Sequence, residues 1–478
     1  MPLQGCHAKI RLPSLLCGVF GLVHPAALIL LLTLSCGIIL ALPARAWAQT
    51  PGLHTAPVVI FGSQIRAATG RPLTTYRLYK SGSNGRAEPI PFQIDELNLD
   101  GDYVLDQGSA VTANSGNGLF DLQDELALMG DDIGPAAAPT DWGVNPPNEV
   151  FEIQFDYRGM PMPPAAWAPD RNKGAVYLAV FHRNPPAPAS KTYVVFDRGT
   201  AEVKTSRYRY GFDQKNWLVS RKVEMRNPSP QAKPEFLPIL DSTTFFMRAD
   251  LKYFLTFEAN HNSVSSELEA YKIGPVRSII RITYYYTLLR LNFELGMYTE
   301  ISFFSNAIFL PAILYNPIDG PKALNSGSGF YYGLALKDNP RDYKIETNMQ
   351  PWQPSGFLNF LKSPFERMQP MYWLSATGTD RMLYMEMTPS AQMNKLGAAP
   401  TFYREDRSGE EIKPRNNDRP NPLGRSPVNL GLNFDLTKFS EGDHLVGFKM
   451  YVDNLRDERR LESYKLMNRW GINAQRIR

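Results

Sequence analysis

The sequence has no cysteine after residue 48, because Cys6, Cys17 and Cys36 are the only three in its 478 residues. This absence excludes disulfides from the rest of the chain. It also excludes cysteine-ligated zinc, iron–sulfur clusters and thiol catalysis there. The chain must therefore be held by its hydrophobic core, for which about 430 residues are ample.

Common catalytic signatures are also missing. The sequence contains no His-Glu-x-x-His, no Walker loop and no Gly-x-Ser-x-Gly, so it does not indicate zincin, P-loop or α/β-hydrolase chemistry. A surplus of positive charge is missing too. Without the basic residues Lys9, Arg11 and Arg45 of the N-terminal segment, 48 basic residues stand against 47 acidic ones. No nucleic-acid partner is expected from this balance.

Residues 1–48 have the pattern of a signal peptide. A basic start is followed by the apolar run Gly18–Leu42 and by small residues that offer cleavage after Ala46 or Ala48. The alternative is an uncleaved membrane anchor, since Ala26–Leu42 approaches spanning length. We expect an exported protein, periplasmic or extracellular, with no spanning segment in the mature chain.

Basic residues are absent between Arg86 and Arg158, and ten carboxylates crowd into Asp95–Asp132 within that interval. Such a one-sided segment either stays solvated or folds around something positive. Hydrophobic residues are spaced through it, so we expect it to fold around a cation.

Two incomplete loops in this segment suggest that the cation is calcium. The first alternates oxygen side chains before a glycine, as an EF-hand-type loop does, but has Gln107 at its twelfth position. The second resembles a dockerin-like calcium loop but opens on Ala113 and Ser115. We therefore predict one shared or irregular site with the candidate ligands Glu96, Asn98, Asp100, Asp102, Asn117, Asp121 and Asp124. The alternative is a pair of Asx turns with solvated acids.

The rest of the chain has the pattern of β-strands. Glu149–Tyr157 alternates strictly between apolar and polar residues, and Asn84-Gly85 is typical of a hairpin turn. No alternation of helices with strands is present, so we predict an all-β fold, an antiparallel β-sandwich. Further strands are expected at Val58–Phe61, Thr74–Tyr79, Ala175–Phe181, Thr192–Phe196, Phe245–Arg248, Tyr253–Glu258, Val276–Leu289, Met297–Phe304, Phe330–Leu336, Met371–Ser375, Met382–Met387 and His444–Val452.

Four prolines in Met160–Pro169 mark a predicted boundary between an N-terminal β domain, 49–160, and a larger β-sandwich domain, 170–478. Thr401–Pro427 is polar and proline-rich and is expected to be a surface loop. Asn454–Trp470 is the one predicted helix, with Asn454 as its cap.

Residues 271–317 begin with Gly274-Pro275-Val276-Arg277 ahead of a long strand. They resemble the supersandwich β-domains of polysaccharide lyases. The resemblance implies a broad sheet that faces a saccharide, and a base that removes a proton next to a carboxylate. It implies His261, Tyr284 and Arg281 as catalytic candidates, and Tyr286, Arg290, Trp352 and Trp373 as ligand-binding candidates. The alternative is that aromatic residues of long strands lie in the core.

Three functions follow from these patterns. The first is a non-catalytic envelope protein, a partner-binding or scaffold module with a structural calcium site. The second is a protein that binds or cleaves an extended polysaccharide. The third is an enzyme of another class that uses a metal site in Asp95–Asp132 directly. The sequence does not decide whether the chain is an enzyme.

Overall fold

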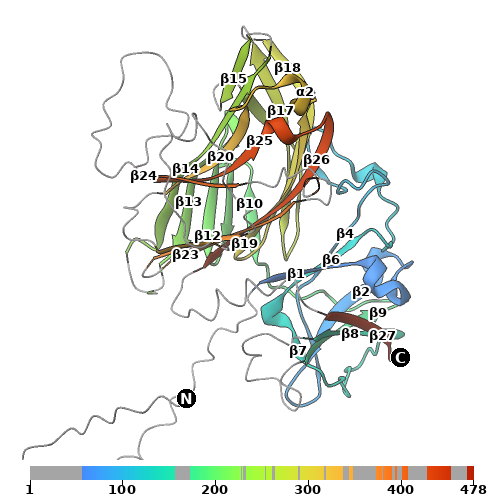
Figure 1. The fold of residues 1–478 in the computed structure, drawn as a ribbon. Coiled ribbons are helices and arrows are strands. Elements are labelled where there is room, and N and C mark those ends of the chain that lie inside the picture. The colour runs from blue at the N-terminus through green and yellow to red at the C-terminus, as the bar shows by residue number, and fades with distance from the viewer. Residues whose placement is uncertain are drawn as a thin grey trace, which may run out of the picture. The chain divides into compact units, whose positions relative to one another are not determined.

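A computed structural model of the chain shows the predicted all-β, sandwich-like fold. Its strands form four antiparallel sheets, which we number 1 to 4 (Figure 1). The residues that the structure describes are 56–156, 173–227, 229, 233–252, 255–260, 264–288, 291–316, 319–336, 344–347, 373–378, 381–389, 393, 395, 401–406, 428–453 and 471–478.

Sheets 3 and 4 are the two layers of the sandwich, with nine strands each in the described residues. Sheet 3 has the order β10 (Val194–Asp197), β11 (Glu202–Thr205), β12 (Tyr208–Asp213), β13 (Asn216–Arg226), β14 (Phe236–Asp250), β20 (Gly329–Leu336), β25 (Val428–Asp435) and β24 (Thr401–Asp406), with β15 (Thr256–Asn260) also on β14. Sheet 4 has the order β21 (Lys344–Thr347), β22 (Trp373–Thr377), β23 (Met382–Pro389), β26 (Gly442–Asp453), β19 (Ala307–Asn316), β18 (Leu291–Phe303), β17 (Ser278–Leu288), β16 (Val264–Ile273) and β5 (Gln107–Gly108).

Sheets 1 and 2 are smaller and come mostly from the N-terminal part of the chain. Sheet 1 has the order β1 (Pro57–Phe61), β6 (Glu125–Met129) and β4 (Gln93–Asp95). Sheet 2 has the order β27 (Gly471–Arg476), β8 (Glu149–Asp156), β9 (Lys173–Val180), β2 (Tyr76–Ser81) and β3 (Ala87–Pro89), with β7 (Gly134–Pro135) on β9.

Helices in the described residues are short. The longest is the 3-10 segment η1 (Gly62–Ala68). The others are η2 (Leu73–Thr75), η3 (Ala113–Ser115), η4 (Gly130–Asp132), α2 (Gly320–Ala323) and η6 (Leu436–Lys438). No described helix has the length and apolar character needed to cross a membrane.

Two large hydrophobic cores hold these sheets. Tyr210 and Phe212 of sheet 3 meet Ile280 and Ile282 of sheet 4 in one buried cluster, so the two large sheets pack face to face. A second cluster joins sheets 1 and 2, and includes Ile60, Leu126, Phe151, Ile153 and Leu178. Apolar residues at alternate positions of these strands fill the cores, as the period of two requires.

The division between the N-terminal and the larger part differs from the predicted one. Strands β8 and β9 pair along their whole length, from Glu149 with Val180 to Asp156 with Lys173. The predicted boundary at 160–169 therefore falls between two paired strands of sheet 2, and the chain passes to sheet 3 only after β9. Prolines exclude a central strand, but a segment without a strand can join two strands of one sheet as readily as two domains.

The end of the chain also belongs to sheet 2. Strand β27 pairs with β8, and its residues Ile472 and Ala474 pack against the second core. The Arg476 guanidinium lies 3.2 Å from Glu149 Oε2. The predicted larger domain, 170–478, thus supplies two strands of the N-terminal sheet.

Other sequence predictions have different outcomes. Asn84-Gly85 does form the turn between β2 and β3, with Gly85 at φ +76°. Residues 401–406, expected in a surface loop, form β24. Three predicted segments lie outside the described residues: the signal peptide 1–48, the part 407–427 of the expected surface loop, and the helix 454–470.

Candidate functional site: the outer face of sheet 4

Alternate residues in each strand of sheet 4 point away from the core that it shares with sheet 3. In β17, Ile280 and Ile282 lie in that core, so Arg281 is on the opposite face. In β26, Met450 lies in the core and Lys449 is on the opposite face. We call this opposite face the outer face. It has two regions, which we call the covered half (β16 to β18) and the aromatic half (β19, β26, β23 and β22).

The acidic segment packs on the covered half. Strand β5, from within that segment, pairs with Ala270 and Tyr271 of β16. Leu105 packs with Ala270 and Ile279 in a small buried cluster. Residues 93–125 therefore form a cover over β16 and β17.

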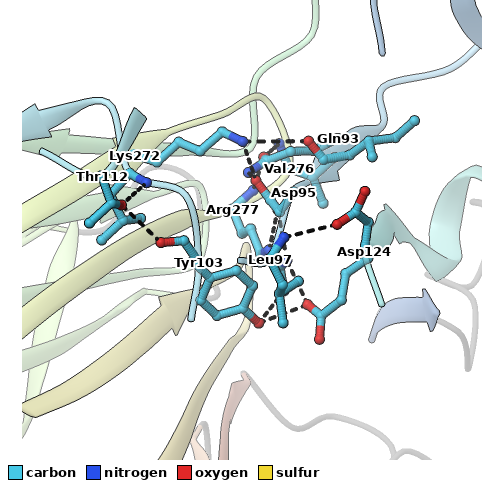
Figure 2. Close-up of polar contacts among 12 residues, drawn as sticks. Gln93, Asp95, Leu97, Tyr103, Thr112, Asp124, Lys272, Val276 and Arg277 are labelled. Carbon is cyan, nitrogen blue, oxygen red and sulfur yellow. Dashed lines mark hydrogen bonds and ion pairs between the residues drawn. The ribbon is translucent and has the colours of Figure 1, made fainter. Parts of the chain in front are cut away.

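Arg277 is the centre of the covered half, and its side chain is only 1% exposed. Its Nε lies 2.8 Å from Asp95 Oδ2, and its Nη2 lies 2.7 Å from Glu125 Oε2 (Figure 2). Lys272 Nζ lies 2.8 Å from Asp95 Oδ1. The ring of Tyr103 lies 5.0 Å from the guanidinium carbon, and its hydroxyl donates to Glu125. Two cations thus meet two carboxylates in a buried, charge-balanced cluster, which we call the Arg277 cluster.

The pKa values follow from this geometry. Burial alone would raise the pKa of Asp95, but Arg277 and Lys272 outweigh it, so its pKa lies below the usual value. Burial alone would lower the pKa of Arg277, but Tyr103 and the two carboxylates leave its pKa well above the usual value. The charged forms of Asp95 and Arg277 are therefore favoured together.

Gln93 fixes the backbone beside Arg277. Its Oε1 accepts from the Arg277 amide at 3.1 Å, and its Nε2 donates to Asp95 at 2.8 Å. Gly274 opens the turn before Arg277, and a Cβ on it would lie 1.9 Å from the Gln93 Oε1. Glycine is therefore needed at 274 for this close approach.

A second ion pair lies further along β17. Arg281 Nη2 is 2.6 Å from Glu300 Oε1, and the Tyr103 amide donates to Glu300 Oε2. Burial raises the pKa of Glu300 more than Arg281 lowers it. Arg281 therefore holds the cover on the sheet, and this differs from the implied role of facing a saccharide.

The acidic segment does fold around positive charge, as its composition predicts. Besides the Arg277 cluster, Arg207 lies 3.7 Å from Asp131 and Lys191 lies 3.6 Å from Asp132. The basic residues come from later parts of the chain, and spacing within the segment could not identify them.

Most of the predicted calcium ligands accept hydrogen bonds from the protein, some inside their own turn, some from the other half-loop and one from a strand of sheet 4. Asn98 Oδ1 accepts from the amides of Asp100 and Asp102, both at 2.9 Å, which is an Asx-turn arrangement. Glu96 Oε1 accepts from the Gly118 amide at 2.7 Å. Asp102 accepts from the Tyr298 hydroxyl.

The second half-loop is similar. Asn117 donates to Asp121 at 2.6 Å, and Asp124 accepts from the amides of Leu97 and Asp121. Burial, with Asp121 and Glu96 nearby, raises the pKa of Asp124. Among the described residues no group of three or more His, Cys, Asp or Glu side chains is arranged to hold a metal ion. Calcium binding stays a prediction.

The aromatic half carries a row of four residues on neighbouring strands. Phe309 of β19 pairs with Lys449 of β26, Lys449 pairs with Glu386 of β23, and Glu386 pairs with Trp373 of β22. Directly paired residues of antiparallel strands have Cβ atoms about 5 Å apart. All four side chains are partly buried. We call Phe309, Lys449, Glu386 and Trp373 the aromatic row.

Two tyrosines lie next to this row on the same face, two residues further along β23 and β26. Tyr451 and Tyr384 are paired, 1% exposed, and have ring centroids 5.9 Å apart. Phe309 lies 6.0 Å from Tyr451, and Trp373 lies 6.1 Å from Tyr384. Tyr451 and Tyr384 lie in one buried cluster with Ala127 and Met129 of β6, and Phe309 and Trp373 pack against this cluster. Sheet 1 therefore covers part of the aromatic half.

Lys449 is placed among these rings. Its Nζ lies 5.0 Å from the centroid of Phe309, within cation–π range. Burial lowers its pKa, and Glu386 opposes that shift in part. A lysine and a glutamate flanked by an indole and a phenyl ring make a surface that combines stacking with hydrogen bonding.

The implied saccharide-binding residues are not brought together. Tyr284 packs against the core between sheets 3 and 4, and burial raises its pKa to about 12. Arg281 lies on the other face of β17, so Tyr284 and Arg281 cannot contact one substrate. Trp373 is the candidate that lies on the outer face. For Tyr286 only the backbone is described, and His261, Arg290 and Trp352 lie outside the described residues.

Sequence reasoning missed Phe309, Lys449 and Glu386. The alternation of residues along β23 could have indicated which side chains lie on the outer face. Leu383, Met385 and Met387 face the core, while Tyr384 and Glu386 between them do not. What was missing was the strand order, because β19, the consecutive pair β22 and β23, and β26 come from three separate parts of the chain.

No protein-family model matches the sequence, and no curated protein sequence matches it. Two solved structures are similar over most of the chain. An alpha-mannosidase from Enterococcus faecalis V583 has 8% identity and a TM-score of 0.39, covering 89% of this chain and 45% of the other. A glycosyl hydrolase family 38 protein from Enterococcus faecalis has 9% identity and a TM-score of 0.37, covering 88% and 45%. The chain spans less than half the length of either, and neither is a polysaccharide lyase.

Proposed function

We propose that this chain is an exported, non-catalytic β-sandwich module that binds an extended saccharide on the aromatic row of sheet 4. The observation that carries the proposal is the cross-strand order Phe309, Lys449, Glu386, Trp373. Rings supply apolar faces on which sugars stack, and the two charged groups supply directional hydrogen bonds.

Rigidity supports a binding role. Phe309 and Trp373 pack against Tyr451 and Tyr384, which are almost fully buried in a cluster with Ala127 and Met129 of sheet 1. A ligand that stacks on such rings does not have to order them first, which favours affinity.

Placement of two of the three nominated catalytic residues supports a role without turnover. Tyr284 lies in the core with a raised pKa, and Arg281 is paired with Glu300 under the acidic cover. Neither can act as a base or an electrophile toward a ligand on the aromatic row.

The test is retention of the mature chain on insoluble polysaccharides, with titration against soluble oligosaccharides. Trp373→Ala is expected to weaken binding by about tenfold, the loss of one stacking contact. The matched control is Phe61→Ala, because Phe61 is an exposed aromatic residue, 45% exposed on β1, that is not a member of the row. No retention on any polysaccharide, or equal loss in both variants, would overturn the proposal.

A further inference from the structure

One buried glutamate of sheet 2 differs from the others in its partners. In β8, Phe151 and Ile153 lie in the second core, so Glu152 is on the opposite face of the sheet. Glu152 is 6% exposed, and in the described part of the chain its partners are all neutral. Each of the other buried glutamates in the described residues lies 3.1 Å or less from an arginine or lysine nitrogen: Glu125, Glu149, Glu202 and Glu300.

Three neutral side chains donate hydrogen bonds to Glu152. Gln475 of β27 and Gln154 of β8 donate to its Oε2 at 2.8 and 2.9 Å, and the Tyr177 hydroxyl of β9 donates to its Oε1 at 3.2 Å. Burial and the charge of Glu152 raise the pKa of Tyr177, so the hydroxyl keeps its proton. Hydrogen bonds to the charged form of a carboxyl group favour ionisation. Glu152 is therefore held as an anion by neutral donors.

This group of side chains is open to solvent on the side of β27. Asn473 and Gln475 lie on the same face as Glu152, because the residues that alternate with them pack against the second core. Gln475 pairs with Glu152, and Asn473 pairs with Gln154. Asn473 and Gln475 are exposed, and Gln154 is partly exposed. The carboxylate thus has neighbours that solvent and small ligands reach.

We infer that this group binds a small primary amine in its protonated, ammonium form. We call its members the Glu152 group: Glu152, Gln154, Tyr177, Asn473 and Gln475. The inference is independent of the proposed function, since it concerns sheet 2 and not the aromatic row of sheet 4.

The hydrogen-bonding capacity of the Glu152 group matches an ammonium. A carboxylate only accepts, so both glutamines turn their NH2 groups toward Glu152 and keep their amide oxygens as further acceptors. A carboxylate has about four lone-pair sites, and three donors leave roughly one of them free. The group therefore offers a negative charge and acceptor oxygens. An ammonium is a compact positive charge with three donors.

Other cations match the Glu152 group less well. A guanidinium binds a carboxylate best through two parallel hydrogen bonds, one to each oxygen. Both oxygens of Glu152 already accept from the protein. Calcium prefers several oxygen ligands, with carboxylates among them, and the Glu152 group contains one carboxylate. Among the described residues no group of three or more His, Cys, Asp or Glu side chains is arranged to hold a metal ion.

The experiment is thermal melting of the mature chain in ethylammonium, tetramethylammonium, methylguanidinium or sodium chloride at equal ionic strength. Ethylammonium has three N–H donors, whereas tetramethylammonium has the same charge and no donor. The melting temperature is expected to be highest in ethylammonium, by roughly 1–2 °C once its concentration exceeds the dissociation constant about tenfold.

Glu152→Gln should abolish the difference between ethylammonium and the other salts. The variant keeps the shape of the side chain and removes its charge. Its amide oxygen can accept from Gln154 and Gln475, and its NH2 can face the Tyr177 oxygen, so the fold is expected to persist. Far-UV circular dichroism checks this. The matched control is Glu267→Gln, an exposed glutamate of β16 on sheet 4, which should keep the full difference.

Three results would overturn the inference. They are equal melting temperatures in ethylammonium and tetramethylammonium, a larger rise in methylguanidinium than in ethylammonium, and a rise in ethylammonium that persists in Glu152→Gln. None of them bears on retention by polysaccharides, so the proposed function is tested separately.

Discussion

The two halves of the outer face of sheet 4 belong to one sheet but differ in how their charged side chains are paired. In the covered half, Arg277 and Lys272 meet Asp95 and Glu125, which come from a segment about 150 to 180 residues earlier in the chain. In the aromatic half, a lysine and a glutamate lie side by side on neighbouring strands. Charges balanced by distant segments hold the fold together, whereas charges placed next to each other among rings are suited to recognition.

The largest expected effect is that of Arg277→Met, which tests the covered half. Removing one partner of a buried ion cluster leaves carboxylates uncompensated, which costs about 3–5 kcal/mol of unfolding free energy. Glu125 would be left in this state, and Asp95 would keep only Lys272. Urea unfolding of the mature chain measures the change.

Lys449→Met is the counterpart in the aromatic half. It is expected to lower the unfolding free energy by less than Arg277→Met does, because burial already lowers the pKa of Lys449 whereas the pKa of Arg277 is raised, so the charged lysine is the less stabilised of the two. Equal losses in Arg277→Met and Lys449→Met would break the comparison.

The second test uses pH, with Asp95 and Glu300 expected to act in opposite directions. The pKa of Asp95 is lowered by folding. Its stabilisation is therefore complete above its unfolded pKa, about 3.9, and is lost as pH falls through the lower folded value. The pKa of Glu300 is raised. Its contribution is present below its unfolded pKa, about 4.3, and is lost as pH rises through the folded value.

Urea unfolding from pH 3 to pH 7 separates the two carboxylates. Asp95→Asn should make stability fall less steeply below about pH 4, and Glu300→Gln should make it rise more steeply above about pH 4. The same slope in both variants would contradict the assignment of one pKa below and one above the usual value.

The smallest expected effect concerns calcium. A loose loop with a dissociation constant of roughly 0.1–1 mM stabilises by about 0.5–1.5 kcal/mol at millimolar calcium. We propose that Asp124→Asn removes this gain, while Asp106→Asn, an exposed acid of the same segment outside the predicted ligand set, preserves it. Thermal melts with calcium and with a chelator measure it. If the unchanged chain melts at the same temperature with calcium and with a chelator, and elemental analysis finds no calcium, the calcium prediction is wrong.

Local pattern predicted much of the fold and little of the site. Alternation in 149–157 located β8, and Asn84-Gly85 located a hairpin. The one-sided charge of the acidic segment also predicted correctly that it folds around positive charge. Its partner Arg277 was not, because the pairing of Asp95 with Arg277 depends on how two distant segments pack. Trp373 was named, but the placing of Lys449 and Phe309 beside it depends on β26 and β19, which come from other parts of the chain.

Strand β27 has a practical consequence for cutting the chain into pieces. Strand β8 has two neighbours in sheet 2, and both, β9 and β27, come after it in the chain. A fragment that stops at residue 160 keeps β8 but loses both, so two rows of backbone amides and carbonyls would be open to any passing strand. Recombinant work on the N-terminal sheet therefore needs the final residues supplied, either in the full chain or as a fused strand.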